Sequence, residues 1–145
     1  MNEDLKEFLR LLNSHEVEYV VIGAHALAFH GHPRFTEDLD LWLARTQENA
    51  ERLAKVLEDF GMPFPPGGKA AFLGEKRMIR LGHPPNRIDV LNFGAEIPFE
   101  EIWLRRVEGK IDDVTVPFIS REDFVQSKRD AGRKRDLADL DAIGE

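Results

Sequence analysis

The chain contains no cysteine among its 145 residues. Disulfide scaffolds, thiolate metal sites and thiol nucleophiles are therefore excluded. No stretch approaches the roughly 18 apolar residues that a membrane-spanning helix requires, and the N-terminus lacks the basic start and apolar run of a secretory signal. We therefore expect a cytoplasmic protein with no membrane partner.

Basic residues are also in deficit, because 20 Lys and Arg face 27 Asp and Glu and the formal net charge is -7. Such a chain is poorly suited to binding nucleic acid through its overall field. The segment 61–95 is the exception, with five basic side chains and two acidic ones. A locally basic segment in an acidic chain favours contact with phosphate groups rather than with a whole duplex.

The composition, 42% hydrophobic and 32% charged, is typical of one globular domain, so we expect a single domain over 1–145. Helical spacing and capping residues predict helices over 3–15, 24–29, 46–60 and 98–105, and two more in a C-terminal helical segment, 120–145. Short apolar or alternating runs predict strands over 19–22, 38–43, 78–81, 87–91 and 114–119.

These elements predict an α+β fold, a small mixed β-sheet with helices packed on it. Helices and strands are interleaved, while the two strands within 78–91 are close enough to form a hairpin. Pro117 predicts an edge position for the last strand, because proline cannot donate a hydrogen bond to a neighbouring strand.

The acidic pair Asp38 and Asp40 is the first candidate site. The two residues lie two apart in a predicted strand, so their carboxylates share one face at a Cα separation of about 7 Å. Carboxylates at this spacing can converge on one divalent cation or a pair of cations. Burying the pair without a neutralising partner is costly. Asp-Leu-Asp is also common on exposed strands, so the pair alone leaves both interpretations open.

Candidate phosphate-binding residues precede the acidic pair. Gly23 ends a strand and starts a helix, which would direct free backbone N–H groups at an anion. Arg34 is able to bind a phosphate through bidentate hydrogen bonds, and Thr36 is able to stabilise the loop before the acidic strand. A glycine after a strand is by itself more often a simple turn, so the order of these features carries the argument.

Gly23-Ala24-His25-Ala26-Leu27, Gly31 and the run from Pro33 to Leu41 together resemble the signature segment of the polymerase-beta-like nucleotidyltransferases. The nearest likeness is to the minimal and abortive-infection toxin branch. The resemblance implies a nucleotidyltransferase-like fold in which Gly23, Ala24 and His25 bind a nucleoside triphosphate. It also implies that Asp38, Asp40 and a third acid are catalytic and hold Mg²⁺ or Mn²⁺.

The matching third acid is Asp89, in the apolar run 87–91. Its alternation with Ile88 and Val90 indicates a carboxylate that points into a partly buried place. The alternative is an ordinary ion pair with Arg87 or Arg80 on the surface of the hairpin.

Lys128 and Arg133, with Asp136 and Asp139, resemble the C-terminal helical motif of the toxin-like branch. The resemblance implies that these basic side chains contribute to nucleotide or acceptor binding. The alternative is a solvated helical face with ion pairs along the helix.

The resulting prediction is a metal-dependent nucleotidyltransferase that moves a nucleoside monophosphate from an NTP to a hydroxyl of an RNA, protein or small-molecule acceptor. No residue decides among a tRNA end, a partner protein and a small antibiotic. Ala24 stands where many members carry Gly or Ser, which leaves only backbone contacts to the triphosphate.

Two alternative functions retain the fold but involve no catalytic turnover. The first is a catalytically inactive nucleotide-binding module, which Ala24 favours. The second is an antitoxin-like interaction module that masks another protein through the loop 63–68 or an apolar face. The short chain leaves no separate acceptor-binding domain, so we expect the acceptor to meet a small surface, a partner subunit or a homo-oligomer.

Overall fold

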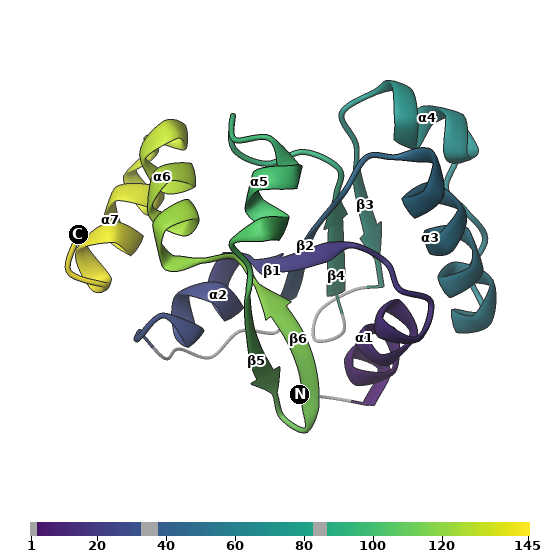
Figure 1. The fold of residues 1–145 in the computed structure, drawn as a ribbon, viewed down its shortest axis with the longest axis horizontal. Helices are drawn as coiled ribbons and strands as arrows, with labels where there is room; N and C mark the ends of the chain where they lie inside the picture. Colours follow the sequence, from purple (N-terminus) through teal and green to yellow (C-terminus); the bar gives the residue numbers. More distant parts are fainter. Residues whose placement is uncertain (1–2, 33–37, 83–86) are drawn as a thin grey trace.

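The computed structural model describes residues 3–32, 38–82 and 87–145 (Figure 1). The helices are α1 (Glu3–Ser14), α2 (Gly23–Phe29), α3 (Gln47–Phe60), α4 (Gly68–Gly74), α5 (Phe99–Leu104), α6 (Arg121–Ala131) and α7 (Lys134–Ala142). The strands are β1 (Tyr19–Ile22), β2 (Asp38–Leu43), β3 (Met78–Leu81), β4 (Arg87–Leu91), β5 (Val107–Ile111) and β6 (Val114–Phe118). The helices and strands predicted before residue 120 lie within one residue of these bounds at each end.

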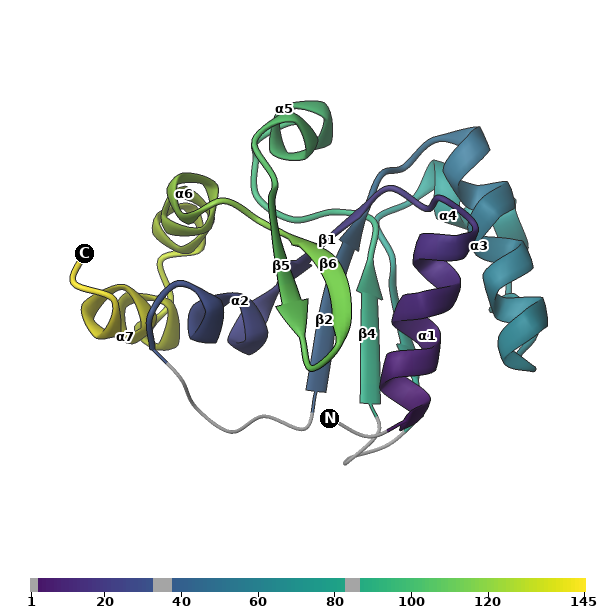
Figure 2. The same ribbon diagram turned by 60° about the horizontal axis from the view of Figure 1, so that its bottom comes forward.

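The strands form one mixed sheet in the order β3-β4-β2-β1-β6-β5. Three neighbouring pairs are antiparallel, namely β1 with β2, β3 with β4 and β5 with β6. The pairs β2 with β4 and β1 with β6 are parallel. Helices α1, α3 and α4 lie on one side, while α2, α6 and α7 lie on the other (Figures 1 and 2). The predicted α+β fold with a small mixed sheet is confirmed.

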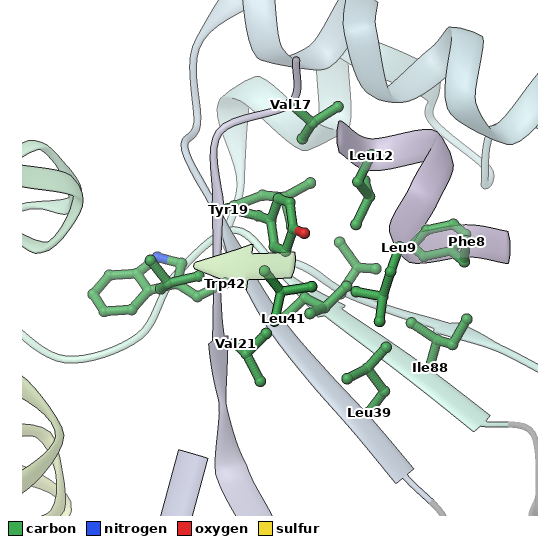
Figure 3. Close-up of a cluster of buried hydrophobic side chains, with 14 of the residues drawn as sticks. Phe8, Leu9, Leu12, Val17, Tyr19, Val21, Leu39, Leu41, Trp42 and Ile88 are labelled. Carbon is green, nitrogen blue, oxygen red and sulfur yellow. The ribbon is translucent and has the colours of Figure 1, made fainter. Parts of the chain in front are cut away.

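Strand β2 has two unlike faces, as its alternating sequence predicts. Leu39 and Leu41 are fully buried and gather with Leu9 of α1 in the main core (Figure 3). Burying one such leucine stabilises the fold by about 2 kcal/mol. Trp42 points away from this cluster and packs edge-on against Phe99 of α5 at 5.6 Å between ring centroids. The acidic residues of β2 share the face of Trp42.

Helix α2 is joined to the β5–β6 hairpin by an aromatic stack. The rings of Phe29 and Phe118 are 4.1 Å apart and nearly parallel. A Cβ added at Gly109 of β5 would lie 2.9 Å from an atom of the Phe118 ring and would overlap Phe29. Gly109 therefore leaves the space in which the stack forms.

Two elements, α4 and β5, were not predicted. The sequence of β5 alternates poorly, and Ile111 is its one buried residue. Helix α4 begins after Gly67 in a glycine-rich segment and buries only Phe72. Both elements lack the apolar periodicity from which helices and strands are predicted.

The edge position predicted from Pro117 is wrong, because β6 lies between β1 and β5. The parallel pairing of β6 with β1 is found at Val21 and Phe118, and the amide of Ile119 donates to the carbonyl of Val21 at 3.1 Å. These contacts follow Pro117 in the chain, so its missing N–H is not needed there.

The C-terminal helical segment is built as its capping residues predict. The Ser120 hydroxyl accepts a hydrogen bond from the amide of Asp123 at 3.1 Å and caps α6. Gly132 ends α6 in the left-handed conformation, with φ of +62°, before α7 begins. Within the described ranges, no helix is both long and apolar enough to cross a membrane.

Candidate active site

The three predicted acids lie on the adjacent parallel strands β2 and β4. Asp40 is paired with Asp89 across the ladder, and Asp38 is paired with Arg87. Residues opposite one another in a ladder project from the same face, as do residues two apart along a strand. The structure therefore brings Asp38, Asp40 and Asp89 onto one face, opposite the face that α1 covers.

Asp89 is buried, with 4% of the residue exposed, and two guanidinium groups neutralise it. Arg80 Nε donates to Asp89 Oδ1 at 3.0 Å. Arg87 Nη2 donates to Asp38 Oδ2 at 2.8 Å and lies 3.6 Å from Asp89 Oδ2. The ion pairs weighed as an alternative for Asp89 are therefore present, but Asp89 is buried and Arg87 also pairs with Asp38.

Asp40 has no comparable compensation. Its carboxylate forms no hydrogen bond or ion pair with any residue that the structure describes. Burial, followed by the negative charges of Asp89 and Asp38, raises the pKa of Asp40 to about 6, although Arg87 and Lys128 act against the shift. This carboxylate therefore lies where additional positive charge would be stabilising.

Gly23 brings the start of α2 directly against Asp40. Its φ of +68° lies in the left-handed region that glycine adopts without strain. A Cβ at this position would overlap Oδ2 of Asp40 and would lie 3.0 Å from its Cβ and Cγ. Conformation and close contact thus both require glycine, and Ala24 and His25 follow in the first turn of the helix.

The His25 ring is partly enclosed. Its Nε2 is buried without a hydrogen-bond partner among the described residues, and burial lowers the pKa of the imidazole. The neutral ring can either donate or accept one hydrogen bond there. Arg34 and Thr36, the other candidate phosphate-binding residues, lie outside the described residues.

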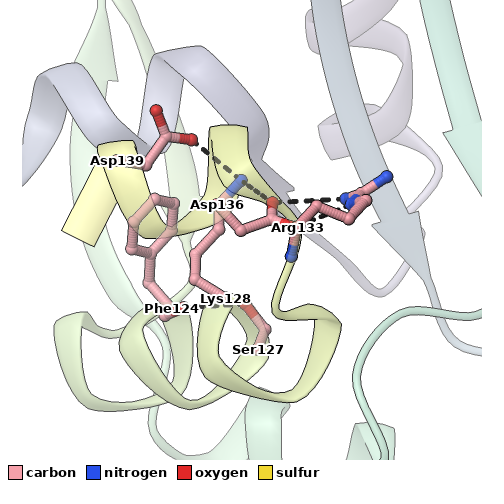
Figure 4. A network of polar contacts seen from close by, with 6 residues as sticks. All are labelled: Phe124, Ser127, Lys128, Arg133, Asp136 and Asp139. Carbon is pink, nitrogen blue, oxygen red and sulfur yellow. Dashed lines mark hydrogen bonds and ion pairs between the residues drawn. The ribbon is translucent and has the colours of Figure 1, made fainter.

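Lys128 and Arg133 both contact Asp136, a fully buried residue of α7 (Figure 4). Lys128 Nζ lies 3.4 Å from Asp136 Oδ1 and 3.1 Å from Asp139 Oδ2. Arg133 Nε donates to Asp136 Oδ2 at 2.6 Å. The ion pairs of Lys128 join α6 to α7, whereas Arg133 is the N-cap residue of α7 and pairs with the residue three positions further along. The charge of Lys128 still acts on Asp40.

The acids suit a hard divalent cation by their chemistry. Such cations prefer carboxylate oxygens, and this face offers three carboxylates. In the described part of the chain, however, no three or more His, Asp or Glu side chains are already arranged to hold a metal ion. The guanidinium of Arg87 lies between Asp38 and Asp89 instead.

A cavity of about 450 Å³, which sequence reasoning did not anticipate, lies between α5 and α6. Arg105 borders it and binds the buried Asp123 through both Nε and Nη2. Glu101 and Gln126 are among the other lining residues. These residues come from separate helices and share no sequence pattern, so no signal in the sequence points to the cavity.

Residues 2–144 match the model of a family described as "Nucleotidyltransferase of unknown function (DUF6036)". The chain belongs to this nucleotidyltransferase family. No curated protein matches its sequence. A solved structure of the lincosamide antibiotic adenylyltransferase LnuA, bound to lincomycin, is similar with a TM-score of 0.58 and 16% identity, covering 99% of this chain and 96% of that one. At this identity the likeness shows a shared fold.

We expect Asp40→Asn to stabilise the metal-free nucleotidyltransferase. Because folding raises the pKa of Asp40 from 3.8 to about 6, the folded wild type binds more protons than the unfolded chain in that window. Its free energy of unfolding therefore falls as pH rises from 4 to 6. At pH 7.5 the variant should be more stable by about 3 kcal/mol, with little difference near pH 4.

Urea denaturation in EDTA at both pH values measures this difference. Glu58→Gln, a change to an exposed residue of α3, is the matched control and should leave stability unchanged at either pH. A D40N protein that is less stable than wild type at pH 7.5 would show that the ionised Asp40 carboxylate does not destabilise the fold.

We expect Asp136→Asn to have the opposite effect on the nucleotidyltransferase. Burial acts to raise the pKa of Asp136, but hydrogen bonds from Arg133 and the charge of Lys128 outweigh it and hold the pKa below its usual value. A lowered pKa contributes stability above the pKa of the unfolded chain, and this is lost as pH falls through the folded value. The variant should lose roughly 1–3 kcal/mol at pH 7.

Chemical denaturation at pH 7 and again near pH 3 checks this loss, which should shrink at the lower pH as the wild-type carboxyl becomes protonated. The exposed Asp141→Asn, also in α7, is the control. Equal losses for the two variants at pH 7 would show that the contacts of Asp136 do not stabilise the α6–α7 pair.

Proposed function

We propose that the chain is a divalent-metal-dependent nucleotidyltransferase that transfers a nucleoside monophosphate from an NTP to a hydroxyl of a small-molecule acceptor. The observation that carries the proposal is the gathering of three carboxylates on one face, with Gly23 packed directly against one of them. The family and the fold support the reaction class.

Asp38, Asp40 and Asp89 would hold Mg²⁺ or Mn²⁺ in this proposal. Bound there, the cation would neutralise phosphate charge and lower the pKa of the attacking hydroxyl. The pKa of Asp40, raised in the metal-free protein, supports this assignment, because a cation would remove the repulsion among the three acids.

The remaining predicted residues bind and orient the nucleotide. Backbone N–H groups at Gly23 and Ala24 would face the triphosphate. His25 Nε2, which has no hydrogen-bond partner among the described residues, would supply a further hydrogen-bonding group from the same turn. Arg34 and Thr36 keep their predicted phosphate-binding roles, as expectations from the sequence. Placing the reactants supplies much of the rate enhancement in phosphoryl transfer.

Lys128 and Arg133 would contribute in different ways. The charge of Lys128 acts on Asp40, so it also favours an anionic nucleotide there. Just over half of the Arg133 side chain is exposed, which leaves part of its guanidinium free to meet a ligand while Nε stays on Asp136. Their ion pairs with Asp136 hold both basic side chains in defined positions.

The transfer itself is one displacement at the α-phosphorus. The acceptor oxygen bonds to the α-phosphorus as the bond from that atom to the bridging oxygen breaks. The electron pair of the broken bond leaves with pyrophosphate, and the hydroxyl proton passes to water. The chain supplies the positions of the two reactants and the charge around them.

A small-molecule acceptor is supported by the space between α5 and α6. Its 450 Å³ is the size of a small-ligand pocket. Trp42, on the same face of β2 as the acids, contacts Phe99 of α5, so the cavity and the acids lie on the same side of the sheet. The net charge of -7 disfavours an RNA acceptor. The similar solved protein is itself an adenylyltransferase of an antibiotic.

We expect Asp38→Asn and Asp89→Asn each to reduce transfer at least about 10³-fold, because each removes a charge that the reaction requires. The assay measures pyrophosphate release from ATP, GTP, CTP and UTP, with a panel of small hydroxyl compounds that includes lincomycin. Wild type should require Mg²⁺ or Mn²⁺ and lose activity in EDTA, and Asp141→Asn should match wild type.

Full activity in both single mutants would remove these acids from the mechanism. Binding of nucleotide to wild type without pyrophosphate release would favour the catalytically inactive nucleotide-binding module. Failure to bind any nucleotide would favour the antitoxin-like interaction module, for which capture of a toxin partner would be the next test.

A further inference from the structure

Arg87 lies among the acids without being one of the predicted site residues. It stands opposite Asp38 in the β2–β4 ladder and two residues before Asp89 in β4, so its side chain projects from the same face. About a quarter of the side chain is exposed, which places the guanidinium within the site rather than in open solvent.

A single nitrogen of Arg87 contacts both acids. Nη2 lies 2.8 Å from Asp38 Oδ2 and 3.6 Å from Asp89 Oδ2, so one positively charged group bridges carboxylates of two different strands. A divalent cation bound to these two oxygens would lie in the same gap. Guanidinium and metal ion therefore compete for the same two oxygens.

The anchorage of Arg87 is weak for an arginine in this position. Its Nε is buried but has no hydrogen-bond partner among the described residues. By contrast, Arg105 binds Asp123 through both Nε and Nη2, in the fork geometry that arginine and carboxylate form best. A buried donor left unused is unfavourable, so the pairing of Arg87 with the acids is less complete than that of Arg105 with Asp123.

Arg80 provides a contrast on the other side of Asp89. It contacts Oδ1 rather than Oδ2 and pairs with no second acid among the described residues, and about half of its side chain is exposed. Removing Arg80 would therefore withdraw one charge near Asp89 while leaving the bridge to Asp38 intact.

We propose that Arg87 is a positioning residue that takes the place of the divalent cation in the metal-free protein. It holds Asp38 and Asp89 together until a metal ion displaces it. The proposal rests on the proposed function for the identity of the cation, and it assigns Arg87 a role that binding measurements can test without catalysis.

Mn²⁺ binding without nucleotide, measured by electron paramagnetic resonance on the full chain, tests the proposal. Arg87→Gln should bind Mn²⁺ roughly fivefold more tightly than wild type, the change expected from removing one competing ion pair. Its melting temperature should be lower than that of wild type in EDTA and should rise more on adding Mn²⁺.

Arg80→Gln is the matched control, because it removes an equal charge next to the same acid. Its Mn²⁺ affinity should change less than twofold. Arg87→Lys, which keeps the charge but loses the planar fork, should bind Mn²⁺ with intermediate affinity. If R87Q fails to fold, the comparison of R87K with wild type decides the question in the same way.

Equal gains in affinity for R80Q and R87Q would overturn the proposal, because the effect would then come from general charge and not from competition for the gap. Unchanged or weaker Mn²⁺ binding by R87Q would also overturn it, even if wild type transfers nucleotides. Tighter binding by R87Q in a protein that releases no pyrophosphate with any NTP would support the role of Arg87 and contradict the proposed function.

Discussion

The pairing of Asp40 with Asp89 across the parallel strands β2 and β4 is the constraint around which this site is organised. Like charges directly opposite one another destabilise a sheet, and burial increases the repulsion. Arg80 and Arg87 offset the negative charge of Asp89 through ion pairs. At Asp40, Gly23 allows the backbone to approach closely because it has no side chain. Asp40 forms no such ion pair among the described residues, and burial together with the neighbouring acids raises its pKa.

The central strands could be predicted because their sequences alternate. Leu39 and Leu41 predict one face of β2, and the acids necessarily occupy the other. Strand β5 could not be predicted in this way, because its place at the sheet edge requires little burial. The edge position predicted from Pro117 is wrong for a related reason. Whether the missing N–H of a proline matters depends on where the neighbouring strand begins to pair, which is a tertiary property.

The candidate site likewise has features that alternation along a strand predicts and features that depend on tertiary structure. Alternation along each strand predicts that Asp38 and Asp40 share a face and that Asp89 is enclosed, and both are found. The register that places Asp40 beside Asp89 depends on contacts between strands far apart in the chain. The role of Arg87 depends on that register too, so from sequence it could be regarded only as a surface partner. The network that ties Lys128 to α7 likewise exists only once the two helices pack.

The stack of Phe29 on Phe118 has a mechanical consequence for α2. This helix has seven residues and is therefore about 10 Å long. Clamping its last residue to the hairpin leaves its first turn little freedom to tilt, while Gly23 is wedged against Asp40 at the other end. The β5–β6 hairpin thus restricts the orientation of α2 and of the backbone amides at its start. It does so from a distance, because β5 lies at the opposite edge of the sheet from β3 and three strands away from β2.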